Sequence, residues 1–200
     1  MSSQADRVLH AVRRAGVLRP RDLDRYGLPR IHLSRLERAG RLERIGRGLY
    51  VLPGSEPGEH RSLAEAAKRV PAGVVCLLSA LRFHELTTQA PYEVWLAIER
   101  KARRPRVEYP SLRVVRFSGP ALHEGVEEHV VEGVPVRVFS PAKTVADCFK
   151  YRHKIGLDVA LEALRECRRG RRCSAEAVWH FAGICRVRNA MRPYLDVVSG

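Results

Sequence analysis

The N-terminal part of the chain alternates between short stretches of helical apolar spacing and single glycines or prolines. The first stretch begins after Ser2 or Ser3, either of which is a suitable N-cap, and ends at Gly16. Its apolar positions recur at helical spacing, at Val8, Leu9, Val12 and Ala15. Pro20 favours the first turn of a second helix over residues 21–26, and a third helix over 30–39 ends before Gly40. Three short helices separated in this way predict a helix-turn-helix.

The residues after the third helix predict a β-hairpin. Residues 42–45 and 49–52 favour two short strands, and the Gly46-Arg47-Gly48 segment between them favours a tight turn. A hairpin directly after the third helix is the wing of a winged helix-turn-helix. Residues 53–58, rich in proline and glycine, are typical of a linker. We therefore predict a DNA-binding domain over residues 1–53 and a second domain over residues 59–200.

The second domain changes between helical and extended patterns. Helices are predicted over 60–70 and 76–86, and strands over 93–98, 112–117, 128–131 and 134–139. Four further helices are predicted over 142–151, 157–168, 175–182 and 187–197, and an exposed basic loop over 99–110. This order of helices, antiparallel strands and helices predicts the α+β class, with a winged helix-turn-helix followed by a mixed domain.

Charge adds a candidate partner to this picture. The chain has 36 Lys and Arg residues against 22 Asp and Glu, a net charge of +14. Residues 1–53 hold 12 basic and 5 acidic residues, residues 54–139 hold 12 and 11, and residues 140–200 hold 12 and 6. Clustered positive charge attracts phosphate polyanions, so nucleic acid is the leading partner and an anionic membrane is the alternative. A GC-rich genome, which favours arginine, is a functionless explanation for the C-terminal charge.

The sequence does not indicate a membrane or exported protein. No apolar run approaches the roughly 20 residues that span a bilayer. The opening residues lack the basic-then-apolar order of a signal peptide. The cysteines form no Cys-x-x-Cys pair, and Cys76, Cys148 and Cys185 lie among apolar neighbours. We expect a cytoplasmic protein with reduced cysteines and without membrane, metal or cofactor.

Four segments together resemble a known family. Residues 41–50 (RLERIGRGLY) are similar to the wing of the N-terminal domain in the AbiEi antitoxin family, from abortive-infection type IV toxin–antitoxin systems. Residues 79–91 (SALRFHELTTQAP), 138–147 (VFSPAKTVAD) and 151–164 (YRHKIGLDVALEAL) resemble later blocks of the same family, in the same order. The resemblance therefore covers nearly the whole chain, and residues 59–200 resemble the family's antitoxin domain.

The resemblance implies an antitoxin that counteracts a nucleotidyltransferase-like toxin and represses its own operon. Its N-terminal domain would bind inverted repeats in double-stranded operator DNA, and we expect a monomer or a weak dimer there. Direct contact with the toxin stays open, because neutralisation in this family does not require a stable complex. The alternative is a DNA-binding transcriptional regulator without a toxin partner.

The third predicted helix has a candidate DNA-reading face. If Leu33 and Leu36 face the core, the opposite face presents four residues and Arg30 lies at its edge, near the helix start. The four are Ile31, Ser34, Arg35 and Arg38. Arginine forms bidentate pairs with guanine, and an exposed isoleucine suits a thymine methyl. The alternative is a solvated face, with Glu37 and Glu43 as ion-pair partners.

Other basic residues are candidates for polyanion contact. Arg47 at the wing tip, flanked by Arg41 and Arg44, is placed to reach a phosphate or a minor groove, whereas Tyr26 and Tyr50 suit packing. A second set of candidates, for an antitoxin or polyanion surface, consists of Arg103, Arg104, Arg106, Arg165, Arg168, Arg169, Arg171 and Arg172. The last five follow the end of a predicted helix, where cations also suit the helix dipole.

Catalysis has only weak support in the sequence. Glu99-Arg100-Lys101 matches the Glu-x-Lys fragment of metal-dependent nucleases, with Glu85 or Glu93 as the further acid that a metal site needs. Lys143, Thr144, Asp147 and Lys150 are of the residue types used in phosphotransfer, but no glycine-rich phosphate loop accompanies them. We predict a protein that is not an enzyme, with a winged-helix nuclease as the catalytic alternative.

Overall fold

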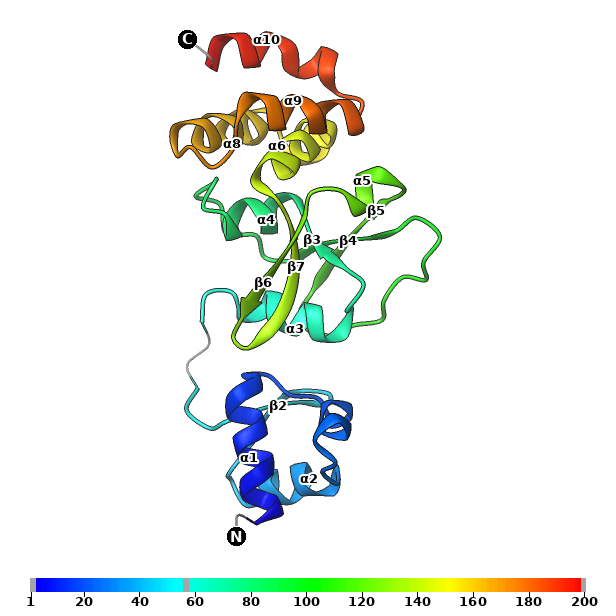
Figure 1. Ribbon diagram of the computed structural model, residues 1–200, viewed down its shortest axis with the longest axis vertical. Helices are drawn as coiled ribbons and strands as arrows, with labels where there is room; N and C mark the ends of the chain where they lie inside the picture. Colours follow the sequence, from blue (N-terminus) through cyan, green and yellow to red (C-terminus); the bar gives the residue numbers. More distant parts are fainter. Residues whose placement is uncertain (1–2, 56–57, 199–200) are drawn as a thin grey trace. The chain divides into compact units, whose positions relative to one another are not determined.

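The computed structural model describes residues 3–55 and 58–198, and it divides the chain into two compact units (Figure 1). One unit comprises Met1–Pro71 and Val130–Val136, and the other comprises Ala72–His129 and Arg137–Gly200. The α+β class is confirmed, with a helix-turn-helix followed by sheets and C-terminal helices. Part of the predicted linker, residues 56–57, and the alternative cap Ser2 lie outside the described residues.

The first helix, α1 (Gln4–Ala15), begins with a capping box. The Ser3 side chain accepts a hydrogen bond from the Asp6 backbone, while the Asp6 carboxylate accepts one from the Ser3 backbone. The Ser3 hydroxyl also donates to the Asp6 carboxylate at 2.7 Å, and this bond, together with the one from the Ser3 backbone, holds the pKa of Asp6 below its ordinary value. The apolar stripe of α1 is buried, and Gly16 ends the helix at a φ of 63°.

The second and third helices lie as predicted, with one change of type. The second, η1 (Pro20–Tyr26), is a 3₁₀ helix that ends at the left-handed Gly27. The third, α2 (Ile31–Arg38), begins one residue later than predicted, because Arg30 is its N-cap. Leu33 and Leu36 are buried, which confirms the predicted core face of α2.

The predicted wing is confirmed as the hairpin of β1 (Glu43–Gly46) and β2 (Leu49–Val51). Tyr50 of β2 also pairs with Leu18, through hydrogen bonds of 3.0 and 2.9 Å between the two backbones. Tyr50 is buried and Tyr26 is half-buried, so both tyrosines pack against the helices. The three helices and the wing therefore share one core.

The helix α3 (Arg61–Arg69) belongs to the N-terminal compact unit. Lys68 Nζ lies 2.7 Å from Asp22 Oδ2, and Arg61 Nε lies 2.9 Å from Glu132 Oε2. Because these contacts join α3 to other residues of the N-terminal unit, the boundary between the two units lies after α3 and not at the predicted linker. The domain ranges 1–53 and 59–200 stay a prediction.

A five-stranded sheet follows in the order β5-β4-β3-β7-β6. Its strands are β3 (Val74–Val75), β4 (Val94–Glu99), β5 (Leu112–Phe117), β6 (Val126–Val131) and β7 (Val134–Phe139). The strands are not all antiparallel as predicted: β3 with β4 is antiparallel, but β4 with β5 and β3 with β7 are parallel. The continuous burial of β4 from Val94 to Ile98 suits a strand between parallel and antiparallel neighbours that is covered on both faces. The short strand β3 and the helix α5 (Pro120–His123) were not predicted.

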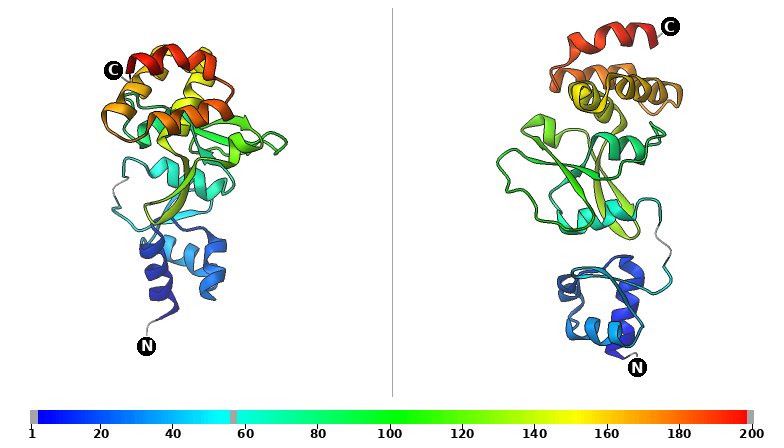
Figure 2. Two further views of the ribbon diagram at one scale, coloured as in Figure 1. Left: turned by 45° about the horizontal axis from the view of Figure 1, so that its top comes forward. Right: turned by 180° about the vertical axis from the view of Figure 1, so that it is seen from behind.

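Helices gather at one end of this sheet (Figures 1 and 2). They are α4 (Leu77–Phe83), α6 (Pro141–Lys150), α7 (Arg152–Ile155), α8 (Leu157–Arg169), α9 (Ala175–Ile184) and α10 (Arg188–Val198). The four predicted C-terminal helices are present, with α7 as an additional turn before Gly156. Aliphatic and aromatic side chains from these helices and the sheet form one apolar core.

The cysteines follow the prediction at three positions. Cys76, Cys148 and Cys185 are buried thiols, and burial raises the pKa of each. The expectation that every cysteine is reduced is wrong for Cys167 and Cys173, which form a disulfide. The turn after α8 brings these two residues, six apart in the sequence, to a Cα–Cα distance of 5.6 Å, within the range of a disulfide.

Candidate nucleic-acid interface

The outer face of α2 carries the residues that the sequence singled out. Ile31 is 53% exposed, Arg35 and Arg38 are exposed, and Ser34 is half-buried. The Ser34 hydroxyl donates a hydrogen bond of 3.0 Å to the Ile31 carbonyl. Within residues 3–55 and 58–198, no ion pair engages Arg35 or Arg38, so the proposed pairing with Glu37 and Glu43 is absent there. The side chains of this face are therefore open to a ligand.

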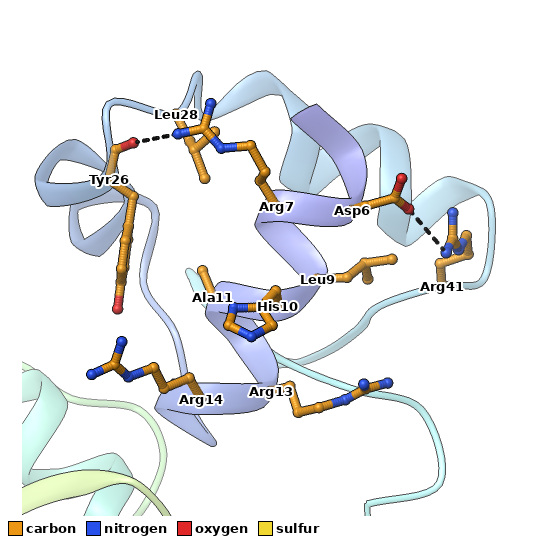
Figure 3. A pocket seen from close by; sticks show the side chains of 10 residues that line it. All are labelled: Asp6, Arg7, Leu9, His10, Ala11, Arg13, Arg14, Tyr26, Leu28 and Arg41. Atoms are coloured by element: carbon orange, nitrogen blue, oxygen red, sulfur yellow. Dashed lines mark hydrogen bonds and ion pairs between the residues drawn. The ribbon is translucent and has the colours of Figure 1, made fainter. Parts of the chain in front are cut away.

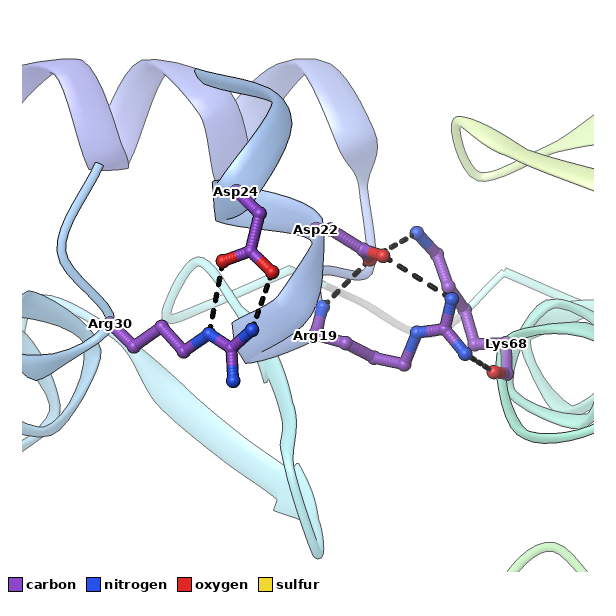
Figure 4. A network of polar contacts seen from close by, with 5 residues as sticks. All are labelled: Arg19, Asp22, Asp24, Arg30 and Lys68. Atoms are coloured by element: carbon purple, nitrogen blue, oxygen red, sulfur yellow. Dashed lines mark hydrogen bonds and ion pairs between the residues drawn. The ribbon is translucent and has the colours of Figure 1, made fainter. Parts of the chain in front are cut away.

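Arg30, at the start of α2, is held by a carboxylate that the sequence analysis did not consider (Figure 4). Its Nε donates to Asp24 Oδ1 at 3.0 Å and its second nitrogen contacts Asp24 Oδ2. The hydrogen bonds from Arg30 hold the pKa of Asp24 below its ordinary value. Because both side chains are more than half exposed, the pair is weak and the guanidinium stays accessible to solvent.

The wing places Arg47 at an exposed turn between Gly46 and Gly48, whose φ of 70° favours glycine. Arg44 is also exposed, and its Nε donates to the Gly46 carbonyl at 3.3 Å. Arg41 turns toward α1 instead, where its guanidinium lies 3.8 Å from Asp6. Arg44 and Arg47 therefore share the hairpin, while Arg41 belongs to a different surface.

That different surface is an open basic hollow on α1, which the sequence analysis missed (Figure 3). The hollow has a volume of about 500 Å³ and its polar lining consists of Asp6, Arg7, His10, Arg13, Arg14 and Arg41. Arg7 donates to the Tyr26 carbonyl at 3.5 Å across it. The spacing of Arg7, His10 and Arg14 along one helix face was the signal in the sequence.

Asp22 of η1 is the centre of a second polar network, which it forms with Arg19 and Lys68 (Figure 4). Asp22 accepts hydrogen bonds from the Arg19 backbone at 2.9 Å and from Lys68 Nζ at 2.7 Å. Burial alone would raise the pKa of Asp22, but these hydrogen bonds and the two cations together lower it. Arg19 and Lys68 are therefore structural cations.

The arginines of the C-terminal basic run differ in their contacts. Arg172 donates to the His84 carbonyl at 2.5 Å and pairs with Glu85, which ties the turn after α8 to the end of α4. Arg169 lies 3.1 Å from Glu166, Arg168 is half-buried, and Arg165 and Arg171 are exposed. The structural role of Arg172 explains one member of the run, while Arg103, Arg104 and Arg106 lie in the predicted exposed loop.

The residues considered for catalysis lie in other settings. Lys143, Thr144 and Asp147 are fully buried in α6, beyond the reach of a substrate. Glu93 contacts Arg113 and Ser111, and Glu85 contacts Arg172. Within the described residues, no three His, Cys, Asp or Glu side chains converge as a metal site would require. In the same residues, no helix is long and apolar enough to cross a membrane.

The helix-turn-helix and its wing are the part of the chain with a family match. Residues 6–53 match the family model described as transcriptional regulator, AbiEi antitoxin. The matched residues include all but the first two residues of α1 and end two residues after the wing. The match does not extend to the later segments that resemble the family.

A solved structure is similar over most of the chain. The crystal structure of the RV2827C protein from Mycobacterium tuberculosis aligns with a TM-score of 0.57 at 15% sequence identity. The alignment covers 90% of this chain and 71% of that one. At this identity the similarity establishes a shared fold. Among curated proteins, no relative matches the chain.

Proposed function

We propose that this chain is a DNA-binding transcriptional regulator of the AbiEi antitoxin type that represses its own promoter. One observation carries the proposal: the part that matches the regulator family exposes Ile31, Arg35 and Arg38 on the outer face of α2. A helix of this kind lies in the major groove of a duplex, with its outer face toward the base edges. Binding of chromosomal DNA would place the protein in the cytoplasm.

The proposed contacts differ in what they recognise. Arg35 and Arg38 would read guanines or hold phosphates, Ile31 would contact a thymine methyl, and Ser34 would bond to a base or phosphate. Arg30, Arg44 and Arg47 would contact the backbone from the helix start and the wing. The protein would bind inverted repeats of double-stranded operator DNA as a monomer or weak dimer.

The experiment measures binding of the full chain to a labelled duplex from upstream of its own gene. Arg35→Ala with Arg38→Ala should weaken binding at least about 30-fold, because a bidentate pair with a base contributes roughly 1–3 kcal/mol. Arg35→Lys with Arg38→Lys keeps the two charges but not the bidentate geometry of arginine. Compared with the alanine variant, it should regain more affinity for a scrambled duplex than for the promoter. Unchanged promoter affinity in the alanine variant would refute the assignment of α2.

A matched control removes the same charge from the other compact unit. Arg103→Ala with Arg104→Ala loses two exposed arginines that lie outside the residues matched by the regulator family. Promoter affinity should stay within about twofold of the wild type, apart from the weak effect of net charge. Equal losses in the two variants would mean that net charge, and not the face of α2, determines binding.

The antitoxin part of the proposal needs a separate experiment. We propose that the chain counteracts a nucleotidyltransferase-like toxin, with or without direct contact. Co-expression should relieve the growth arrest that a neighbouring toxin of this class causes. Arrest that persists beside soluble protein would favour the alternative, a transcriptional regulator without a toxin partner.

A further inference from the structure

A second basic surface lies in the C-terminal compact unit, around the connection between β4 and β5. Residues 92–117 hold seven Lys or Arg residues and three Glu residues. The remainder of residues 54–139 holds five basic and eight acidic residues. The near-neutral charge of this part of the chain therefore conceals one locally positive segment.

The sheet topology explains why this segment forms a surface. Because β4 and β5 are parallel, with Val94 opposite Leu112, residues 100–111 must return along the whole length of the strand pair. Arg116 anchors the start of this loop by donating to the carbonyls of Glu99, Arg100 and Ala102, at 3.3, 2.7 and 2.8 Å. The loop then borders a hollow of about 420 Å³, whose charged lining consists of Arg104, of Arg113 and Arg116 from β5, and of Glu93.

Three arginines of the loop are available to a ligand. Arg103, Arg104 and Arg106 are exposed, and among the described residues none of them forms an ion pair. Arg113 is engaged instead, 3.4 Å from Glu93 and 4.9 Å from the centre of the Trp95 ring. The loop itself therefore offers three cations to a ligand.

Two exposed aromatic rings flank the same strands. Tyr92 is 97% exposed and Tyr109 is 57% exposed. Tyr92 lies two residues before Val94 and Tyr109 lies three residues before Leu112, so the parallel register brings both tyrosine backbones to the same end of the strand pair. We name the set of Tyr92, Arg103, Arg104, Arg106 and Tyr109 the loop surface.

We propose that the loop surface binds single-stranded nucleic acid. Tyr92 and Tyr109 would stack on unpaired bases, and the three arginines would contact phosphates. Aromatic rings beside a positive groove are the combination that single-strand binding uses, because every unpaired base offers a π-face. A duplex hides these faces inside its stack, and an acidic protein would engage the arginines without needing exposed rings. This inference goes beyond the proposed function, in which the other compact unit binds duplex DNA.

The test measures fluorescence anisotropy of the full chain with labelled 12-nucleotide probes. The probes are single-stranded RNA, single-stranded DNA of the same sequence, a random duplex of equal length and an acidic peptide of poly-glutamate. We expect both single strands to bind at least about tenfold more tightly than the random duplex or the peptide. A preference between RNA and DNA would identify the natural source of the ligand, since only RNA has the 2′-hydroxyl.

Four variants separate stacking, phosphate contact and the DNA-binding face. Tyr92→Ala with Tyr109→Ala should weaken single-strand binding by about 10- to 100-fold, and Tyr92→Phe with Tyr109→Phe should retain it, because stacking needs the ring and not the hydroxyl. Replacing Arg103, Arg104 and Arg106 with alanine should reduce the slope of log affinity against log salt by about 2, or about 0.7 for each phosphate contact. Arg35→Ala with Arg38→Ala should weaken promoter binding strongly but single-strand binding by no more than about twofold, through net charge alone.

One charge change should strengthen the interaction. Glu108 is exposed next to Tyr109 and opposes a polyanion, so Glu108→Gln should tighten single-strand binding about twofold at low salt. Two results would overturn the proposal: equal affinity for poly-glutamate, or single-strand affinity that survives loss of both tyrosine rings. Thermal unfolding of the tyrosine variant should match the wild type because both rings are exposed, so lost binding cannot be ascribed to lost folding.

Discussion

Replacing Lys143 with methionine tests how much its buried ion pair with Asp147 contributes to the stability of the C-terminal compact unit. Lys143 and Asp147 lie one turn apart on α6, with Nζ 2.5 Å from Oδ2 and both side chains 0% exposed. The ammonium also lies 4.1 Å from the centre of the Phe139 ring and 4.9 Å from that of Phe117. Cys185 donates from Sγ to the other carboxylate oxygen of Asp147 at 3.1 Å.

The expected change in the free energy of unfolding follows from the complete burial of both charged side chains. Burial raises the pKa of Asp147, against the attraction of Lys143. Lys143→Met leaves the carboxyl with the weak thiol donor of Cys185, and Asp147→Leu leaves an ammonium among aromatic rings. Removing one partner of a buried pair lowers the free energy of unfolding by about 3–5 kcal/mol. The double variant, Lys143→Met with Asp147→Leu, removes both charges and should differ little from the wild type or be more stable by about 1–4 kcal/mol.

Urea titration followed by tryptophan fluorescence suits this test. Both tryptophans, Trp95 and Trp179, belong to the C-terminal unit, so the signal reports the unit that contains α6. With a urea dependence of about 2 kcal/mol per molar, each single variant should lower the unfolding midpoint by roughly 2 M. Single variants within about 1 kcal/mol of the wild type would refute the reasoning, as would a double variant no more stable than the weaker single one.

Two further predictions concern the backbone at Gly125 and the ion pair of Asp22. A Cβ at Gly125, whose φ is 70°, would lie 2.8 Å from Lys143 Cβ and from Phe181 Cζ. Gly125→Ala should therefore lower the free energy of unfolding by about 2 kcal/mol or more. A shift of the urea midpoint below about 0.5 M in the same titration would contradict this prediction. The pKa of Asp22 lies below its ordinary value of 3.8 in the folded chain, so its contribution to stability is present above that value and is lost as the pH falls through the folded pKa. Far-UV circular dichroism against pH should show this acid loss reduced in Asp22→Asn, and identical curves for the two proteins would contradict the role of Lys68 beside it.

The N-terminal unit was predictable because its signals are local. Ser3 caps α1, Gly27 ends η1, and the two glycines around Arg47 mark the wing, each within a few residues of what it controls. Helical spacing also predicted which face of α2 is buried, since rotation along a helix needs no tertiary information. It did not predict the Arg30–Asp24 pair, which depends on how η1 and α2 are placed relative to each other.

In the C-terminal unit, local sequence signals predicted some elements but not the arrangement of the sheet. The helices other than α5 and α7, and the two strands Leu112–Phe117 and Val134–Phe139, were predicted from periodicity alone. The strand β3 has only two residues, too few to show a period, yet it lies between β4 and β7 in the sheet. Whether its neighbours run parallel or antiparallel depends on chain crossings that span tens of residues.

The sequence by itself therefore determined most of the elements, the exposed face of α2 and the clustering of charge, because periodicity, capping and composition act over short distances. The tertiary structure decided which charges are available to a ligand. It buried Lys143 with Asp147, engaged Arg172 with His84 and Glu85, and left Arg104 exposed beside β5. Arginines and lysines that look alike in sequence differ in these roles because burial and partners come from distant segments of the chain.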